Sequence, residues 1–169
     1  MSLQEKVFKQ LMTDPHNNFC FDCGWLGPEY VSLNHGIYLC FNCAIGIHQK
    51  HYAVEVSCVK PIFSTFNLVQ LKVLINGGNK NCKEFLEHYD LDQETTSKKY
   101  NTEAAQFYRE KLRRQVESGF LLSKETLPDV QVGRARLVHK KALTPQVKHY
   151  AGLNYKDILS TCLEWKSID

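Results

Sequence analysis

Four cysteines carry the spacing in this chain that is most informative about chemistry. Cys20, Cys23, Cys40 and Cys43 form a C-x2-C-x16-C-x2-C array. The two-residue gap within each pair lets one tight turn direct both sulfurs at a single ion, and zinc accepts four thiolates in a tetrahedron. The chain opens without an apolar leader, which favours a reducing, intracellular compartment and disfavours two disulfides. We therefore expect one structural zinc ion.

Length and composition favour a single ordinary core. The 169 residues are 43% hydrophobic, which is enough to bury one core, and no stretch reaches the roughly 18 apolar residues of a membrane span. The net charge of +3 is divided unevenly, because residues 1–97 carry seven lysines and ten acids whereas residues 98–169 carry fourteen basic and eight acidic residues. We expect a soluble or peripheral protein with a basic second half.

The basic residues gather in a segment that contains no acid. Between Gln131 and Lys156 the basic residues are Arg134, Arg136, Lys140, Lys141, Lys148 and Lys156. Blocks of like charge are usually solvated, but such a block also suits an acidic surface such as anionic lipid. Interspersed apolar residues could instead pack on the domain. The candidates for a membrane surface are Arg134, Arg136, Lys140 and Lys141, within a basic extension over residues 123–169 whose order the sequence leaves open.

Short elements surround the cysteines. Ser2 and Glu5 form a capping box that predicts a helix over residues 3–12. Extended pieces are expected at residues 30–33 and 37–39, with Gly36 as the turn between them. Alternation over residues 54–58 predicts a third strand, which Pro61 should stop.

Apolar spacing predicts three further helices. The first covers residues 68–75 and is closed by Gly77 and Gly78. The second carries Cys82, Phe85, Leu86 and Tyr89 on one face, and polar residues 90–97 follow as a linker. The third runs over residues 101–116. These apolar faces are expected to form the core rather than a cofactor groove.

Several blocks together resemble the Arf GTPase-activating protein domain. The first is the cysteine array with Gly24, Pro28–Ser32 and Gly36–Leu39, and it is followed by Gly77-Gly78-Asn79. Lys99-Tyr100-Asn101, Ala104-Ala105 and Tyr108–Leu112 then match in order and spacing. The resemblance covers about residues 3–120, and the predicted domain runs over residues 1–122.

This resemblance implies an α+β fold in which a four-cysteine zinc finger and a small three-stranded sheet pack against several α-helices. It also implies a partner, an Arf-family small GTPase bound in its GTP state, whose hydrolysis the domain stimulates in membrane traffic. The protein would be an activator rather than an enzyme in its own right. Its expected location is cytoplasmic, at the periphery of the Golgi or other endomembranes.

The chain departs from the family pattern at the position of the catalytic arginine. Most members insert an arginine from just after the fourth cysteine to neutralise charge on the transferred phosphoryl group. An alignment without a gap places His48 there, and one extra residue at Ile45 places Gln49 there. Lys50 is close, but an ammonium lacks the bidentate fork of a guanidinium. We take His48, Gln49 and Lys50 as the candidate partner-binding residues.

Three functional hypotheses follow. The domain could be a working activator, or an Arf-binding module that lacks the catalytic side chain. The third is a GATA-like nucleic-acid binder, since that finger has a nearly identical cysteine spacing. Such a binder needs basic residues directly after the last pair. Between Ala44 and Lys60 the basic residues of this chain are only Lys50 and Lys60, so we expect no nucleic acid as a partner.

Overall fold

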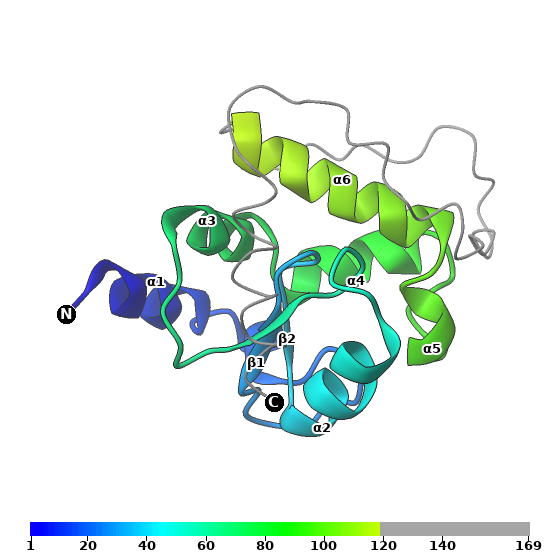
Figure 1. Ribbon diagram of the computed structural model, residues 1–169, viewed down its shortest axis with the longest axis horizontal. Coiled ribbons are helices and arrows are strands. Elements are labelled where there is room, and N and C mark those ends of the chain that lie inside the picture. Colours follow the sequence, from blue (N-terminus) through cyan, green and yellow to red (C-terminus); the bar gives the residue numbers. More distant parts are fainter. Residues whose placement is uncertain (119–169) are drawn as a thin grey trace.

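A three-stranded antiparallel sheet lies at the centre of the computed structural model, which describes residues 1–118 (Figure 1). Its strands are β1 (Tyr30–Ser32), β2 (Ile37–Leu39) and β3 (Val59–Pro61), in the order β2-β1-β3. Tyr30 lies opposite Leu39 on one side and Pro61 on the other. The hairpin between β1 and β2 turns at Gly36, whose φ of +63° suits glycine.

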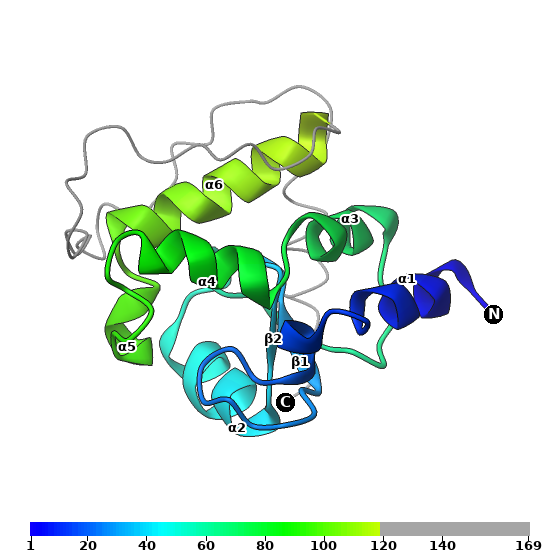
Figure 2. The same ribbon diagram turned by 180° about the vertical axis from the view of Figure 1, so that it is seen from behind.

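Helices surround this sheet on both sides. They are α1 (Leu3–Leu11), the 3-10 helix η1 (Pro15–Asn18), α2 (Phe41–Cys43), the π-helix η2 (Ala44–Gln49), α3 (Leu68–Asn76), α4 (Asn79–Glu87), α5 (Thr96–Lys99) and α6 (Glu103–Ser118). Helix α6 packs on α3 and α4, and α1 packs on α3. Helix α2 lies on the side of the sheet away from α6 in both views (Figures 1 and 2). The predicted α+β class is confirmed.

Local sequence signals explain where the helices begin. The Ser2 hydroxyl accepts from the Glu5 amide at 3.2 Å and the Glu5 carboxylate accepts from the Ser2 amide, so the predicted capping box forms. Asn67 and Gln70 form a second capping box at the start of α3. These contacts satisfy backbone N–H groups that have no partner within the helix.

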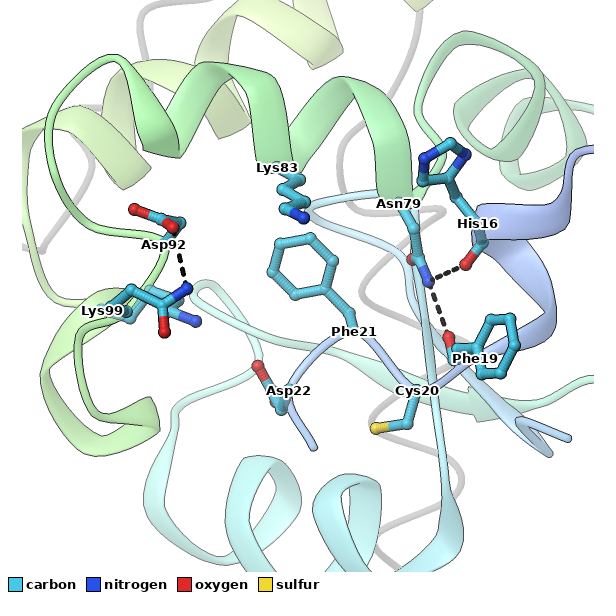
Figure 3. A pocket seen from close by; sticks show the side chains of 10 residues that line it. His16, Phe19, Cys20, Phe21, Asp22, Asn79, Lys83, Asp92 and Lys99 are labelled. Carbon is cyan, nitrogen blue, oxygen red and sulfur yellow. Dashed lines mark hydrogen bonds between the residues drawn. The ribbon is translucent and has the colours of Figure 1, made fainter. Parts of the chain in front are cut away.

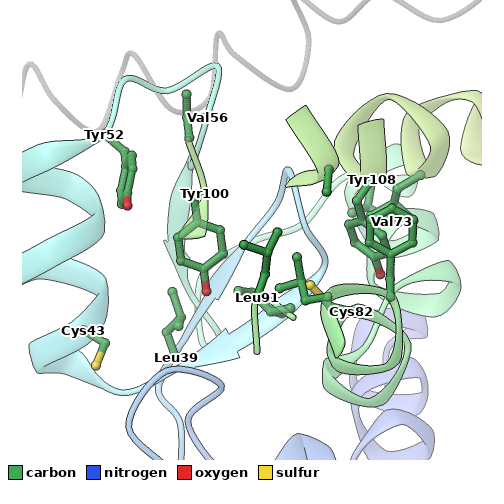
Figure 4. Packing of buried hydrophobic residues seen from close by; sticks show 14 of the residues in the cluster. Leu39, Cys43, Tyr52, Val56, Val73, Cys82, Leu91, Tyr100 and Tyr108 are labelled. Atoms are coloured by element: carbon green, nitrogen blue, oxygen red, sulfur yellow. The ribbon is translucent and has the colours of Figure 1, made fainter. Parts of the chain in front are cut away.

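The two faces of the sheet belong to different apolar clusters. Val31 and Tyr38 lie opposite each other and pack in one cluster with Leu74 of α3. Ile37 and Leu39 point the other way, into a larger cluster with α4 and α6 (Figure 4). Because alternate residues of a strand point to opposite faces, short strands suffice to tie both clusters together.

The strand predicted over residues 54–58 is wrong, because this segment forms a turn and β3 begins only at Val59. The Asn34 side chain donates to the carbonyls of Val54 and Glu55 and accepts from the Cys58 amide, so it takes the place of a neighbouring strand. The alternation arises because Val54 and Val56 bury into the two different clusters. Pro61 is the last residue of β3, so the strand ends at the predicted proline, whose missing N–H is tolerated on an edge strand.

None of the helices within residues 1–118 is both long enough and apolar enough to cross a membrane.

Candidate functional site

The four cysteines of the predicted metal site converge from two turns. Cys20 and Cys23 lie on the loop after η1, whereas Cys40 follows β2 and Cys43 ends α2. The four sulfur atoms all lie within 4.8 Å of one another. Cys40 also caps α2, since its sulfur accepts from the Cys43 amide at 3.5 Å. One strand and one short helix therefore fix half of the ligand set.

The donor set fits zinc. Thiolates 2.3 Å from one tetrahedral ion lie about 3.8 Å apart, and the Cys23 and Cys40 sulfurs are 3.6 Å apart. Three of the cysteines are buried, Cys23 is exposed, and none of the four forms a disulfide. Burial raises the pKa of the Cys20 thiol to about 11, so a bound ion would displace a proton that the thiol otherwise keeps.

His48 was expected on the surface facing a partner, but the structure buries it completely. Its Nε2 atom lies 2.6 Å from a carboxylate oxygen of Asp22, and its Nδ1 atom lies 2.6 Å from the Ser57 hydroxyl. Asp22 stands between Cys20 and Cys23, so this contact joins η2 to the turn over residues 20–23, which we call the zinc turn. Both ring nitrogens of His48 are therefore committed inside the domain, which makes an internal role better supported than contact with a partner.

Gln49 and Lys50 remain available to a partner. Gln49 is half-buried and Lys50 is exposed, directly after the buried His48. The segment Ala44–Gln49 is a π-helix, and a π-helix takes up one more residue per turn than an α-helix. A π-helix over this segment is compatible with the alignment that has one extra residue at Ile45.

The sequence did not single out Asp22, Ser57 or Tyr100 as site residues. Asp22 accepts hydrogen bonds from both His48 and the Tyr100 hydroxyl. The Tyr100 ring lies 4.8 Å from that of His48. No local pattern connects residues so distant in sequence. Two of them lie inside family motifs, Asp22 in Cys20-Phe-Asp-Cys23 and Tyr100 in Lys99-Tyr100-Asn101, and this placement is the signal that could have suggested them.

A pocket of about 320 Å³ opens beside the zinc turn and α4 (Figure 3). Lys83 and Lys99 line it together with Asp22 and Asp92. The Lys99 ammonium lies 5.5 Å from the centre of the Phe21 ring. Because the lining carries both signs of charge, it does not define the charge of a ligand.

The basic candidates Arg134, Arg136, Lys140 and Lys141 lie outside the described residues, as does the predicted domain boundary at residue 122.

A four-cysteine finger joined to a three-stranded sheet and a helical layer defines the class of this domain. The family model "ArfGap: Putative GTPase activating protein for Arf" matches residues 5–118. The chain therefore belongs to the ArfGAP family, as its motifs predicted.

Curated relatives share this region. ADP-ribosylation factor GTPase-activating protein 3 of Bos taurus is 36% identical over 109 residues, which are 63% of this chain and 21% of that protein. The ADP-ribosylation factor GTPase-activating protein GCS1 of Saccharomyces cerevisiae is 32% identical over 105 residues, 61% of this chain and 29% of that protein. The matched region thus spans about a fifth to a third of the length of these relatives.

A solved structure supports the fold. The crystal structure of a putative GTPase activating protein for ADP ribosylation factor from Cryptosporidium parvum matches with a TM-score of 0.62 and 24% identity. The match covers 68% of this chain and 91% of that one.

Proposed function

We propose that this protein binds an Arf-family small GTPase in its GTP state and stimulates GTP hydrolysis, as the names of its curated relatives suggest. The GTPase binds the nucleotide, and this domain supplies side chains to the active site of the GTPase. The protein is then an activator rather than an enzyme in its own right. Its setting would be membrane traffic at the Golgi or other endomembranes.

The observation that carries this proposal is the family match over residues 5–118. We infer that Gln49 takes the position where most members insert an arginine, and the burial of His48 supports this inference. An amide can donate a hydrogen bond to a phosphate oxygen or orient water, but it brings no positive charge. A guanidinium at this position contributes about 10³ to 10⁵ in rate, so stimulation by the wild type should be correspondingly weak.

The arginines within residues 1–118 do not offer a substitute on that segment. Arg109, Arg113 and Arg114 all belong to α6, which lies across the sheet from α2 (Figure 2). This arrangement favours a second candidate function, an Arf-binding module that docks without stimulating hydrolysis. The two candidates share the docking step and differ only in rate.

Single-turnover GTP hydrolysis by several Arf proteins separates them. We expect wild type to accelerate hydrolysis weakly and Gln49→Arg to raise the rate at saturating domain by at least about tenfold, because the new guanidinium neutralises developing charge. A wild type that binds GTP-loaded Arf but leaves the rate unchanged supports the second candidate. No binding to any Arf protein would refute both.

Two control variants test the position. Lys50→Arg places a guanidinium one residue further along an exposed part of the chain and should raise the rate less than Gln49→Arg does. His48→Arg puts the charge in a fully buried site and removes two hydrogen bonds, so it should destabilise the domain instead of activating it. If His48→Arg activates and Gln49→Arg does not, the assignment of Gln49 is wrong.

We propose zinc as the ion of the four-cysteine site, with a structural role. Cys20, Cys23, Cys40 and Cys43 would supply four thiolates, which complete a tetrahedral shell and leave no open position for water or substrate. The ion would hold the Asp22 turn against α2.

We also propose that the basic extension binds an anionic membrane surface near a membrane-bound Arf protein. Within this extension, residues 131–156 carry six basic residues and no acid, and each charge near such a surface is worth about 1 kcal/mol. Liposome co-sedimentation should show binding to anionic vesicles that weakens at high salt. Equal binding to neutral vesicles, or no loss when Arg134, Arg136, Lys140 and Lys141 become alanine, would end this proposal.

A further inference from the structure

A chain of buried polar side chains crosses the domain from α6 to the zinc turn. Arg109 Nη1 donates to His35 Nε2 at 3.3 Å, and His35 Nδ1 lies 3.3 Å from the Ser32 hydroxyl. That hydroxyl is 2.8 Å from the Ser57 hydroxyl. Ser57 then contacts His48, which contacts Asp22. We call these six residues the buried relay: Arg109, His35, Ser32, Ser57, His48 and Asp22.

The ends of the buried relay determine the direction of every hydrogen bond in it. An arginine only donates and an ionised carboxylate only accepts. His35 Nε2 must therefore accept, so its Nδ1 carries the proton and donates to Ser32. His48 Nε2 must donate to Asp22, and in a ring that carries only this proton Nδ1 accepts from Ser57. With both imidazoles neutral, each contact has one donor and one acceptor, and all donors point towards Asp22.

Aromatic rings enclose this chain. The Tyr100 ring lies 4.8 Å from the ring of His35 and 4.8 Å from that of His48. Its hydroxyl donates to Asp22, and its carbonyl accepts from Arg109 at 2.9 Å, so Tyr100 links both ends. The side chains of His48 and Asp22 are no more than 1% exposed. Hydrogen bonds in so dry a setting are costly to break singly, because each loss leaves a buried group unsatisfied.

We propose that the buried relay positions η2, and with it Gln49, relative to the zinc turn and the sheet. The relevance to GTP hydrolysis rests on the proposed function, whereas the positioning of η2 does not. The π-helical form of η2 gives such a contact a purpose, since π-helices are rare and occur mostly as single turns, often at functional sites. His48 and Ser57 are thus positioning residues, and Gln49 is the residue they present.

The first test reads the tautomers. Long-range proton–nitrogen NMR of the zinc-loaded wild type at pH 7.5 should show His48 protonated at Nε2 and His35 protonated at Nδ1. The opposite tautomer at either ring, or a doubly protonated ring, would overturn the directed chain. A histidine with mobile surroundings would instead show averaged nitrogen shifts, which also contradicts it.

The second test removes one link. Ser57→Ala deletes a hydroxyl that bridges Ser32 and His48 without touching a zinc ligand. Amide hydrogen exchange over residues 44–50 should become at least about tenfold faster, with the zinc content unchanged. Ser64→Ala is the matched control, because Ser64 donates only to the nearby Pro61 carbonyl outside the relay. If Ser57→Ala does not fold, Tyr100→Phe removes the hydroxyl donated to Asp22 and keeps the ring. Equal exchange in variant and control overturns the proposal.

The third test uses activity. In the Gln49→Arg background, Ser57→Ala should lower the rate at saturating domain about tenfold and leave the half-saturating concentration nearly unchanged, because docking residues remain exposed. A change in half-saturation alone would mean that the relay shapes docking and does not position residue 49. If no Arf protein responds to any variant, the proposed function fails, while the tautomer and exchange measurements still decide whether the relay holds η2.

Discussion

Neighbouring residues in η2 have opposite surroundings. The side chain of His48 is fully buried and bonded at both ring nitrogens, while Gln49 reaches the surface and Lys50 is exposed. A substitution at 48 therefore tests the interior, and one at 49 or 50 tests the partner surface. This division supports our proposal that Gln49 takes the position of the missing arginine.

The cysteines allow the sharpest test at the residue scale. Cys40→Ala removes one of four ligands and the sulfur that caps α2. Structural zinc contributes on the order of 10 kcal/mol in small modules, so this variant should lose its ion and leave residues 19–60 without stable structure. Elemental analysis and amide exchange measure the two effects. Purified wild type that contains no zinc would contradict the assignment.

Cys82→Ala is the matched control. Cys82 is also a free cysteine and fully buried, but it lies in the core and outside the cluster of four zinc-site cysteines (Figure 4). Its replacement should cost about 1 kcal/mol of packing and leave one zinc ion per chain. Loss of zinc in this variant would mean that general destabilisation, and not ligand removal, empties the site.

Elements with strong local signals were predictable from the sequence. The capping box at Ser2 and the apolar spacing of α3 and α4 act within one or two turns of chain, so their pattern is visible in one dimension. The cysteine pairs are local in the same sense. Each of these predictions is confirmed by the structure.

Elements whose partners lie far along the chain were not predictable. The segment over residues 54–58 alternates like a strand, but the Asn34 side chain occupies its polar groups. The buried relay likewise joins residues from 22 to 109, and none of its members is specified by its neighbours in sequence. His48 is buried by contacts with residues that are distant in sequence. Its sequence neighbours do not reveal these contacts, so it was expected on the surface.

The hairpin turn packs directly on the end of α3, and this contact can be tested. A Cβ atom on Gly36 would lie 3.0 Å from the Gly77 Cα atom and 3.0 Å from the Val73 carbonyl oxygen. Both obstacles are backbone, and the φ of +63° adds strain for any side chain. Gly36→Ala should therefore reduce the free energy of unfolding by roughly 2 to 4 kcal/mol in chemical denaturation.

Gly27→Ala separates the two causes. Gly27 has a similar φ of +80°, but a Cβ there would meet nothing within 4 Å. This variant should lose only about 1 to 2 kcal/mol, from backbone strain alone. If both variants lose the same amount, close packing of the hairpin on α3 does not contribute to stability.

The folded domain buries His35 in its neutral form. His35 is 1% exposed, and its burial lowers its pKa well below the usual 6.5, with a further contribution from the charge of Arg109. The unfolded chain exposes this histidine and binds a proton near pH 6.5, whereas the folded chain does not. Acid therefore favours the unfolded state through this one residue.

The expected stability profile follows from that difference. Well above pH 6.5 His35 is neutral in both states and contributes no slope. As the pH falls below 6.5, the free energy of unfolding should decrease by up to about 1.4 kcal/mol per pH unit on account of this group, until the folded pKa is reached. Chemical denaturation between pH 5.5 and 7.5 in excess zinc measures the slope.

His35→Gln is the control, because it retains an acceptor for Arg109 and a donor for Ser32 but cannot titrate. Its free energy of unfolding should therefore depend less steeply on pH, by the contribution of one proton. Other acid-sensitive groups, including the zinc thiolates, contribute equally to both proteins and cancel in the comparison. Identical slopes would show that His35 is protonated in the folded state, contrary to the directed hydrogen bonds around it.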